Sequence, residues 1–213
     1  MSGSLSAAGL TTRFAGVVAL HEVDLEVRPG EIVGLIGPNG AGKTTCFNSL
    51  TGFVTPNEGT VVLNGEDVTA LPPAERARRG MVRTFQQVVL FKHLSVRENL
   101  LLGRHIHYGA NGLSGVLRTP KARAAEPSVL LLDEPGAGMD PTESDYFGDL
   151  LLQIHDGNHS VVLIEHDVPM VLRVCDRIYV LQFGKLIAQG SPDEIRANAA
   201  VREAYFGSAV EVA

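Results

Sequence analysis

The chain has 213 residues, of which 45% are hydrophobic, so it is long enough for one packed domain. Its net charge of −6 argues against a nucleic-acid-binding protein, which usually carries a basic face. The first ten residues lack the basic start and apolar core of a signal peptide, and no apolar run reaches the roughly 18 residues of a membrane span. Two distant cysteines, Cys46 and Cys175, predict reduced thiols in a cytosolic protein. Any membrane association is therefore expected to be peripheral.

The chain opens with an alternating stretch at residues 17–27 that predicts a strand, ended by a turn at residues 28–30. Phe14 lies just before it. Spacing alone favours Phe14 as a core side chain, although an aromatic residue that flanks a nucleotide site can also stack on adenine.

The next segment, EIVGLIGPNGAGKTT at residues 31–45, runs from a buried strand through a glycine-rich loop into a predicted helix over 43–50. It fits the pattern G-x-x-x-x-G-K-[ST] of a phosphate-binding loop. Lys43 is expected to reach the β- and γ-phosphates of a nucleotide, and the Thr44 hydroxyl to ligate Mg²⁺. The residues of the predicted loop are Gly37, Pro38, Asn39, Gly40, Ala41, Gly42, Lys43, Thr44 and Thr45.

Two small elements follow the loop. Residues 60–69 predict a β-hairpin turning at Asn64-Gly65, and residues 72–80 predict a short helix. The clustered basic residues of that helix are expected to face solvent rather than bind a partner. They are Arg76, Arg78 and Arg79.

A strand over residues 81–86 is predicted to end at Gln86. A glutamine at the carboxyl end of a strand can orient a water or touch a metal, although an exposed amide is the default. The capping box at Ser95 and Glu98 predicts a helix over 96–107. The sequence then loses its periodicity.

The apolar runs at residues 128–134 and 160–165 predict strands that are buried on both faces of a parallel sheet. Asp133 and Glu134 end the first strand, and His166 follows the second. Ligands of open α/β sheets bind at this edge, so the two carboxylates can divide the work of holding Mg²⁺ and polarising a water, and His166 can contact a γ-phosphate. An acidic pair can instead cap a helix, but Pro135-Gly136 follows here.

The last part of the chain predicts a helix that begins after Asp140, a hairpin over 177–188 and a C-terminal helix capped by Ser191. The first of these helices is expected to bury one apolar face, made of Tyr146, Phe147, Leu150, Leu151 and Ile154.

Three predicted strands, at residues 31–36, 128–133 and 160–165, thus end in residues suited to nucleotide chemistry. The fold class predicted is α/β, a P-loop NTPase whose mainly parallel central sheet is flanked by helices. A small antiparallel β subdomain is expected around residues 5–30 and 60–70, within one domain that spans residues 1–213.

With these motifs in view, the chain resembles the ATP-binding subunits of ABC transporters. The resemblance rests on GPNGAGKTT at 37–45, RTFQ at 83–86, VLLLDEP at 129–135, GAGMDP at 136–141 and LIEHD at 163–167. RTFQ, the GLSGVLRTP loop and the ending from Cys175 to Gly207 are similar to the branched-chain amino acid importer subfamily.

The resemblance implies a role for each matching residue. Phe14 would stack on adenine, Glu134 would act as the general base, and His166 would sense the γ-phosphate. Mg²⁺ and the attacking water would be served by Thr44, Gln86 and Asp133. Asp140 would lie in the loop that meets a partner subunit.

One departure from the family concerns the segment between Gln86 and the strand at residues 129–133. The family carries an LSGGQ-like signature and a helical subdomain there, and both are nearly absent here. The fragment Leu113-Ser114-Gly115 matches the subfamily's preceding loop better than the signature. The chain is therefore either a longer protein from which several dozen residues are left out, with the join within Lys121 to Pro127, or a truly shortened one that binds ATP but hydrolyses it poorly. The first explanation is favoured because every other motif is intact.

The function expected is that of an ATP-hydrolysing importer subunit for branched-chain amino acids, with ATP and Mg²⁺ as cofactors. Its partners would be transmembrane permease subunits and a second ATP-binding subunit, a copy or a relative, at the cytoplasmic face of the inner membrane. The alternative is a regulatory or scaffold protein that binds nucleotide without turnover. A related ATPase that acts on nucleic acid or ribosomes is disfavoured by the negative net charge of the chain and by its single phosphate loop.

Overall fold

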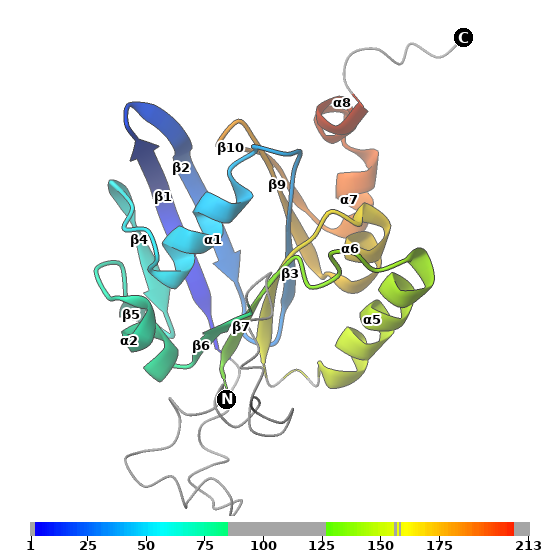
Figure 1. Ribbon diagram of the computed structural model, residues 1–213, viewed down its shortest axis with the longest axis horizontal. Helices are drawn as coiled ribbons and strands as arrows, with labels where there is room; N and C mark the ends of the chain where they lie inside the picture. The colour runs from blue at the N-terminus through cyan, green and yellow to red at the C-terminus, as the bar shows by residue number, and fades with distance from the viewer. Residues whose placement is uncertain (1–2, 85–126, 156, 158, 207–213) are drawn as a thin grey trace, which may run out of the picture.

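The computed structural model describes residues 3–84, 127–155, 157 and 159–206. Within this part of the chain, an antiparallel sheet, a central sheet and a layer of helices follow one another across the molecule (Figure 1). Gln86, the helix predicted over 96–107 and the fragment at 113–115 lie outside the described residues.

The antiparallel sheet has four strands in the order β2-β1-β4-β5. They are β1 (Leu5–Phe14), β2 (Val17–Val27), β4 (Glu58–Leu63) and β5 (Glu66–Asp67). The turn between β4 and β5 has positive φ at both central residues, 53° at Asn64 and 82° at Gly65, which is the backbone that an Asn-Gly hairpin turn requires. The predicted small antiparallel element is confirmed.

The central sheet has six strands in the order β10-β9-β3-β8-β7-β6. They are β3 (Ile32–Ile36), β6 (Met81–Arg83), β7 (Val129–Asp133), β8 (Ser160–Ile164), β9 (Arg177–Gln182) and β10 (Lys185–Gly190). β3 pairs in parallel with both β8 and β9, and β7 pairs in parallel with β6 and β8, whereas β10 runs antiparallel to β9. The mainly parallel sheet predicted from the apolar runs is confirmed, and β3, β7 and β8 end at the same edge.

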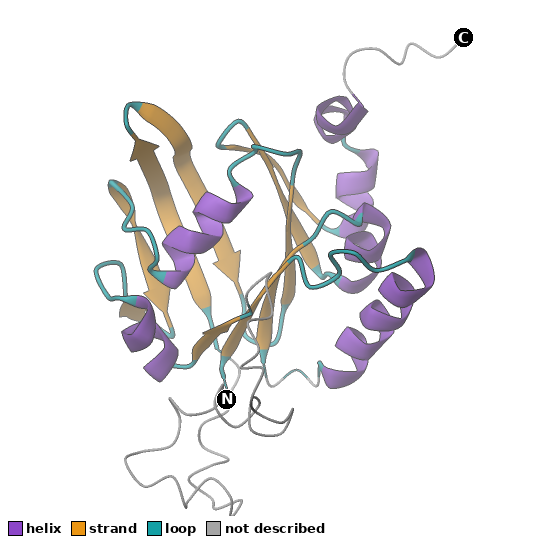
Figure 2. Ribbon diagram, viewed as in Figure 1, coloured by secondary structure: helices purple, strands orange, loops and turns teal. Residues whose placement is uncertain are grey.

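Helices cover both faces of the central sheet (Figure 2). α1 (Lys43–Thr51) lies between the two sheets, and α2 (Pro73–Arg78) lies beside β5. The opposite face carries α5 (Pro141–Ile154), α6 (Val168–Val174), α7 (Pro192–Ala197) and α8 (Ala199–Phe206).

Alternation along β3 divides the buried side chains into two hydrophobic cores. Val33 and Leu35 join the core that contains Phe47 and Leu50 of α1. Ile32 and Ile36 point the other way and join the core that contains Leu151, Met170, Val171 and Ile195. Because successive side chains of a strand point to opposite faces, an all-apolar strand such as β3 must be covered on both sides.

The structure corrects the expectation that the arginines of α2 all face solvent. The Arg76 side chain is buried, and its guanidinium donates hydrogen bonds to the carbonyl oxygens of Ser49 and Leu50 at 2.8 and 2.6 Å. Those carbonyls belong to the last turn of α1, where helix carbonyls lack intrahelical partners. Burial lowers the pKa of Arg76 to about 10. Arg76 therefore acts as a structural clamp for the carboxyl end of α1.

The apolar face predicted for α5 is also partly wrong. Leu151 is buried and Phe147 packs against the second core, but Tyr146 and Leu150 are 71% and 39% exposed. Ser144 is buried in their place. The helix thus packs through residues 144, 147 and 151. The buried face is rotated relative to the predicted one, which included Tyr146 and Leu150. The side chain of Ile154 lies outside the described residues.

Candidate functional site

The loop between β3 and α1 follows a path that only glycine allows at two positions. Gly37 has φ 153° and Gly42 has φ 104°. A Cβ atom at Gly37 would lie 2.2 Å from the carbonyl oxygen of Leu181, and one at Gly42 would lie 2.8 Å from that of Ala19. Backbone conformation and close neighbours therefore both exclude side chains here.

Lys43 lies at the amino end of α1 and is buried. Its Nζ donates hydrogen bonds to the carbonyl oxygens of Gly37 and Pro38 at 2.7 and 3.1 Å. Burial lowers the pKa of Lys43, while the charge of Glu134 acts in the opposite direction. The ammonium group is thus held inside the curve of the loop. A phosphate group bound there would be its second anionic neighbour, besides Glu134.

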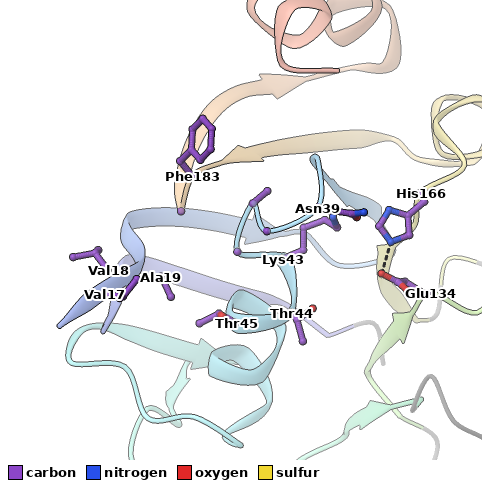
Figure 3. A pocket seen from close by; sticks show the side chains of 14 residues that line it. Val17, Val18, Ala19, Asn39, Lys43, Thr44, Thr45, Glu134, His166 and Phe183 are labelled. Carbon is purple, nitrogen blue, oxygen red and sulfur yellow. Dashed lines mark hydrogen bonds and ion pairs between the residues drawn. The ribbon is translucent and has the colours of Figure 1, made fainter. Parts of the chain in front are cut away.

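A cavity of about 460 Å³ opens beside this loop (Figure 3). Residues 39–45 form its floor, while β2 contributes Val17, Val18 and Ala19 and the β9–β10 turn contributes Phe183 and Gly184. Glu134 and His166 lie at the end opposite Phe183 (Figure 3). One end of the cavity is therefore largely apolar and the other carries ionisable groups, which suits a ligand with a flat base and a charged tail.

Glu134 and His166 are brought together by the neighbouring ends of β7 and β8. Nε2 of His166 lies 2.5 Å from Oε1 of Glu134 (Figure 3). The Glu134 backbone N–H donates to the carbonyl oxygen of Ile164 at 2.9 Å, so the loop after β7 stays attached to β8. Glu134 has φ 47°, an unusual backbone for a residue with a side chain. Strained backbone of this kind clusters at functional sites.

Asp133 is buried and paired with Arg83 of β6, whose Nη2 donates to Oδ2 of Asp133 at 2.6 Å. Arg83 also donates to Oδ1 of Asn48 at 2.6 Å, and its guanidinium lies over the rings of Phe47 and Phe53 at 5.1 and 5.3 Å. The Asp133–Arg83 pair was not predicted from the sequence, although Arg83 opens the RTFQ motif that carried part of the resemblance.

The other predicted residues are placed as follows. Asn39, Gly40, Ala41, Thr44 and Thr45 all line the cavity. Phe14 does not line it; its side chain is 47% exposed on β1, where it pairs in register with Val17, which does. The exposed Phe183 of the cavity wall was missed by the sequence reasoning. No pattern marks it, because it lies in a hairpin turn at positive φ.

The residues present fit a nucleoside triphosphate and a magnesium ion. Among the described residues no side chain caps the amino end of α1, so its first backbone N–H groups are left for an anion bound at the loop. The hydroxyl of Thr44 and the carboxylate of Asp133 are the oxygen ligands that Mg²⁺ prefers. The cavity is large enough for a ligand of nucleotide size.

Comparison with known proteins gives one consistent family. Residues 20–126 match the family model described as "ABC transporter", and residues 185–211 match one described as "Branched-chain amino acid ATP-binding cassette transporter". The high-affinity branched-chain amino acid transport ATP-binding protein LivG of Escherichia coli is 39% identical, over 96% of this chain and 98% of LivG. BraF of Pseudomonas aeruginosa, which has the same description, is 38% identical over the same shares.

Solved structures agree with the sequence comparison. The ADP conformation of MJ1267, an ATP-binding cassette of an ABC transporter, is similar with a TM-score of 0.82 and 26% identity, covering 97% of this chain and 100% of that one. A nucleotide-free ATP-binding cassette from an ABC transporter gives 0.80 and 27%, covering 95% and 98%. Of the helices that the structure describes, none is long and apolar enough to cross a membrane.

Proposed function

The chain belongs to the ATP-binding proteins of ABC transporters, and from that premise we propose that it hydrolyses ATP to power an importer of branched-chain amino acids. The family and the P-loop fold predicted from the motifs are confirmed by the comparisons. The substrate class of the importer is carried over from LivG and BraF, whose descriptions name branched-chain amino acid transport.

The observation that carries the proposal is the placement of Glu134 and His166 beside the phosphate loop, at the end of the cavity opposite Phe183 (Figure 3). A nucleotide whose phosphates lie on the loop would point its γ-phosphate toward this pair. Glu134 then serves as the general base for a water attacking in line, and His166, hydrogen-bonded to Glu134, contacts the γ-phosphate. Lys43 neutralises charge on the β- and γ-phosphates.

The family resemblance also suggests the residues for Mg²⁺ and for adenine. We propose Thr44, Asp133 and Gln86 as the residues that hold Mg²⁺, which neutralises phosphate charge when bound. Phe14 is proposed to stack on adenine. Residues 1–213 are proposed to form one ATP-binding domain whose helical subdomain is either truncated around 108–127 or left out of the printed sequence there.

The proposed partners are the permease subunits of the importer and a second ATP-binding subunit, a copy or a relative. Asp140 would lie in the loop that meets that second subunit. Together these partners would hold the protein at the cytoplasmic face of the inner membrane as a peripheral component. Closure of the two ATP-binding subunits around ATP, and reopening after hydrolysis, would drive transport.

The Glu134→Gln variant tests the proposed reaction. An amide keeps the size of the side chain and removes its ability to accept a proton, so ATP should bind as in the unaltered protein while steady-state hydrolysis falls by about 100-fold or more. Equilibrium binding of ATP and release of phosphate measure the two effects separately. Glu203→Gln, an exposed change on α8, is the matched control. Unchanged hydrolysis in Glu134→Gln would remove Glu134 from its role.

A second candidate function is supported by one observation from the comparison. The alignment with LivG extends over 250 residues, more than the 213 of this chain, so LivG contains residues without a counterpart here. The LSGGQ-like signature is among the features missing from the sequence. A protein that binds nucleotide without turnover, acting as a regulator or scaffold, is favoured if the unaltered chain binds ATP yet shows no hydrolysis even with its membrane partners present.

A further inference from the structure

Three consecutive residues after β8 each contact a different point of the segment that follows β7. Oε1 of Glu165 accepts a hydrogen bond from the Gly136 backbone N–H at 2.6 Å. His166 contacts the Glu134 carboxylate at 2.5 Å. The Ser144 hydroxyl donates to the carboxylate of Asp167. The loop that carries Glu134 is therefore fixed to the end of β8 at two places, and the first turn of α5 at a third.

Of these three residues, the proposed mechanism gives a task to His166 alone, and Glu165 is the one whose hydrogen bonds flank the Glu134–His166 contact on both sides. Its side chain is only 4% exposed, and its second carboxylate oxygen accepts from the His166 backbone N–H at 3.1 Å. A single buried carboxylate thus bridges two backbone amides, one two residues after Glu134 and the other on His166 itself. Burial raises the pKa of Glu165, and the two amide hydrogen bonds act against that rise.

The bridge closes a ring around the Glu134–His166 contact. Going around it, Glu134 connects through Pro135 to Gly136, Gly136 bonds to Glu165, and Glu165 leads to His166, which contacts Glu134 again. A Cβ at Gly136 would lie 2.9 Å from Oε1 of Glu165, which shows how closely the carboxylate approaches this backbone. Rotation of either loop away from the other would have to break the bridge.

We propose that Glu165 is a positioning residue for ATP hydrolysis, which sets the distance between the Glu134 carboxylate and the His166 ring by tying their two loops together. The inference rests on the proposed function, because it gives Glu165 a role only if Glu134 and His166 act on the γ-phosphate. Glu165 does not line the cavity, so it acts on the reaction through these two neighbours rather than on the nucleotide.

A purely structural role predicts different behaviour from a positioning role. Loss of a structural contact lowers the fraction of folded protein and leaves kcat per folded molecule and ATP affinity unchanged. Loss of a positioning contact leaves ATP affinity unchanged but lowers kcat, since a shift of about 1 Å in a reacting group can cost on the order of 100-fold in rate.

The experiment compares Glu165→Gln with the unaltered full chain. The glutamine amide has one oxygen, and its NH₂ group cannot accept from a backbone N–H, so one of the two bonds is lost. We expect the Kd for ATP to stay within about twofold, kcat to fall by roughly 10- to 100-fold, and hydrogen exchange at the Gly136 or His166 amide to accelerate. The matched control is Glu194→Gln, because Glu194 accepts from the Ser191 backbone N–H at 2.8 Å and does not line the cavity.

A second variant covers the case in which Glu165→Gln does not fold. Glu165→Asp keeps the charge but is one methylene shorter and cannot span both amides, so kcat should again fall with ATP affinity kept. A kcat within twofold of the unaltered chain for the folded variants, or unprotected Gly136 and His166 amides in the unaltered chain, would overturn the inference. Absence of hydrolysis in the unaltered chain even with its membrane partners present would overturn the proposed function, and the inference with it.

Discussion

Phe183 and Phe14 compete as the aromatic side chain for adenine. Phe183 lines the cavity and is 83% exposed. Phe14 does not line the cavity, but it pairs across β1 and β2 with Val17, which does. Adenine is a flat ring, so one exposed aromatic side chain at this end of the cavity is expected to stack on it, with a gain of about 0.5–1.5 kcal/mol.

The family resemblance assigns the adenine contact to Phe14. If Phe14 makes it, Phe14→Ala is predicted to weaken ATP binding by about two- to tenfold, with the Kd measured by calorimetry or fluorescence. Phe183→Ala, at the apolar end of the cavity, is the comparison variant. A larger loss of affinity in Phe183→Ala than in Phe14→Ala would contradict the assignment of Phe14 and give the adenine contact to Phe183.

Arg83 and Asp133 form an ion pair whose side chains are only 11% and 9% exposed. Removing one partner of such a pair leaves a buried charge without compensation. Arg83→Met is predicted to lower the free energy of unfolding by about 3 kcal/mol, measured by urea denaturation without nucleotide. The double variant Arg83→Met with Asp133→Asn should recover part of the loss, because the buried charge is then gone.

The control for this pair is Arg78→Met, which removes an exposed contact with Glu75 on α2. Exposed ion pairs contribute between about 0 and 1 kcal/mol, so Arg78→Met should change stability little. Equal losses in Arg83→Met and Arg78→Met would show that the Asp133 carboxylate does not depend on Arg83.

At the scale of secondary structure, the elements around the site could be predicted because their signals are local. β3, β7 and β8 are apolar runs, β3 followed at once by the glycine-rich loop and the other two by ionisable residues, and α5 is capped at Asp140 by a complete capping box. The face that α5 buries was harder to predict, because Tyr146 and Leu150 are apolar and yet exposed. The burial of Arg76 could not be predicted because its guanidinium donates to backbone carbonyl groups, both nearby at Thr69 and Leu71 and far away in the sequence at the end of α1, and carbonyl groups carry no sequence pattern.

The amino end of α5 offers a direct test of one local signal. The Asp140 side chain accepts from the Glu143 backbone N–H at 2.9 Å, and the Glu143 side chain accepts from the Asp140 backbone N–H at 3.0 Å. Asp140→Ala is predicted to lower the free energy of unfolding by about 1 kcal/mol in urea denaturation. Gln153→Ala, exposed on the same helix, should change it by less than about 0.5 kcal/mol. Equal stability in both variants would argue against a contribution from the cap.

At the scale of the whole molecule, backbone hydrogen bonds at the β9–β10 turn bring distant segments to one site. The loop after β3 is attached to the β9–β10 turn, where the Gly184 backbone N–H donates to the carbonyl oxygen of Ala41 at 2.9 Å. The same turn accepts from the His21 backbone N–H at 2.9 Å, which belongs to β2. The phosphate loop, the antiparallel sheet and the C-terminal hairpin are therefore held together at the cavity, a convergence that no single stretch of sequence displays.

The last prediction concerns what the chain lacks as a family member. In the family, two subunits enclose ATP, and each phosphate loop faces the other subunit's signature. A protein of the printed sequence, whose mass is 22.7 kDa, brings the loop and Glu134 but no complete signature. Alone, it is predicted to bind ATP and to hydrolyse it slowly at every protein concentration. An intact mass measurement confirms first that the purified protein has the printed length.

Mixing the chain with an ATP-binding subunit that carries an LSGGQ-like signature should then raise turnover at this chain's phosphate loop, because the enclosed site would gain its missing donors. Loss of one preorganised donor costs about 100-fold or more in other enzymes, so an increase of at least about tenfold is expected. To restrict the measurement to this chain, the added subunit carries a substitution of its own phosphate-loop lysine. Glu134→Gln in this chain should abolish the increase. If turnover does not rise on mixing, the absent signature does not limit hydrolysis, and binding without turnover becomes the better account of this protein.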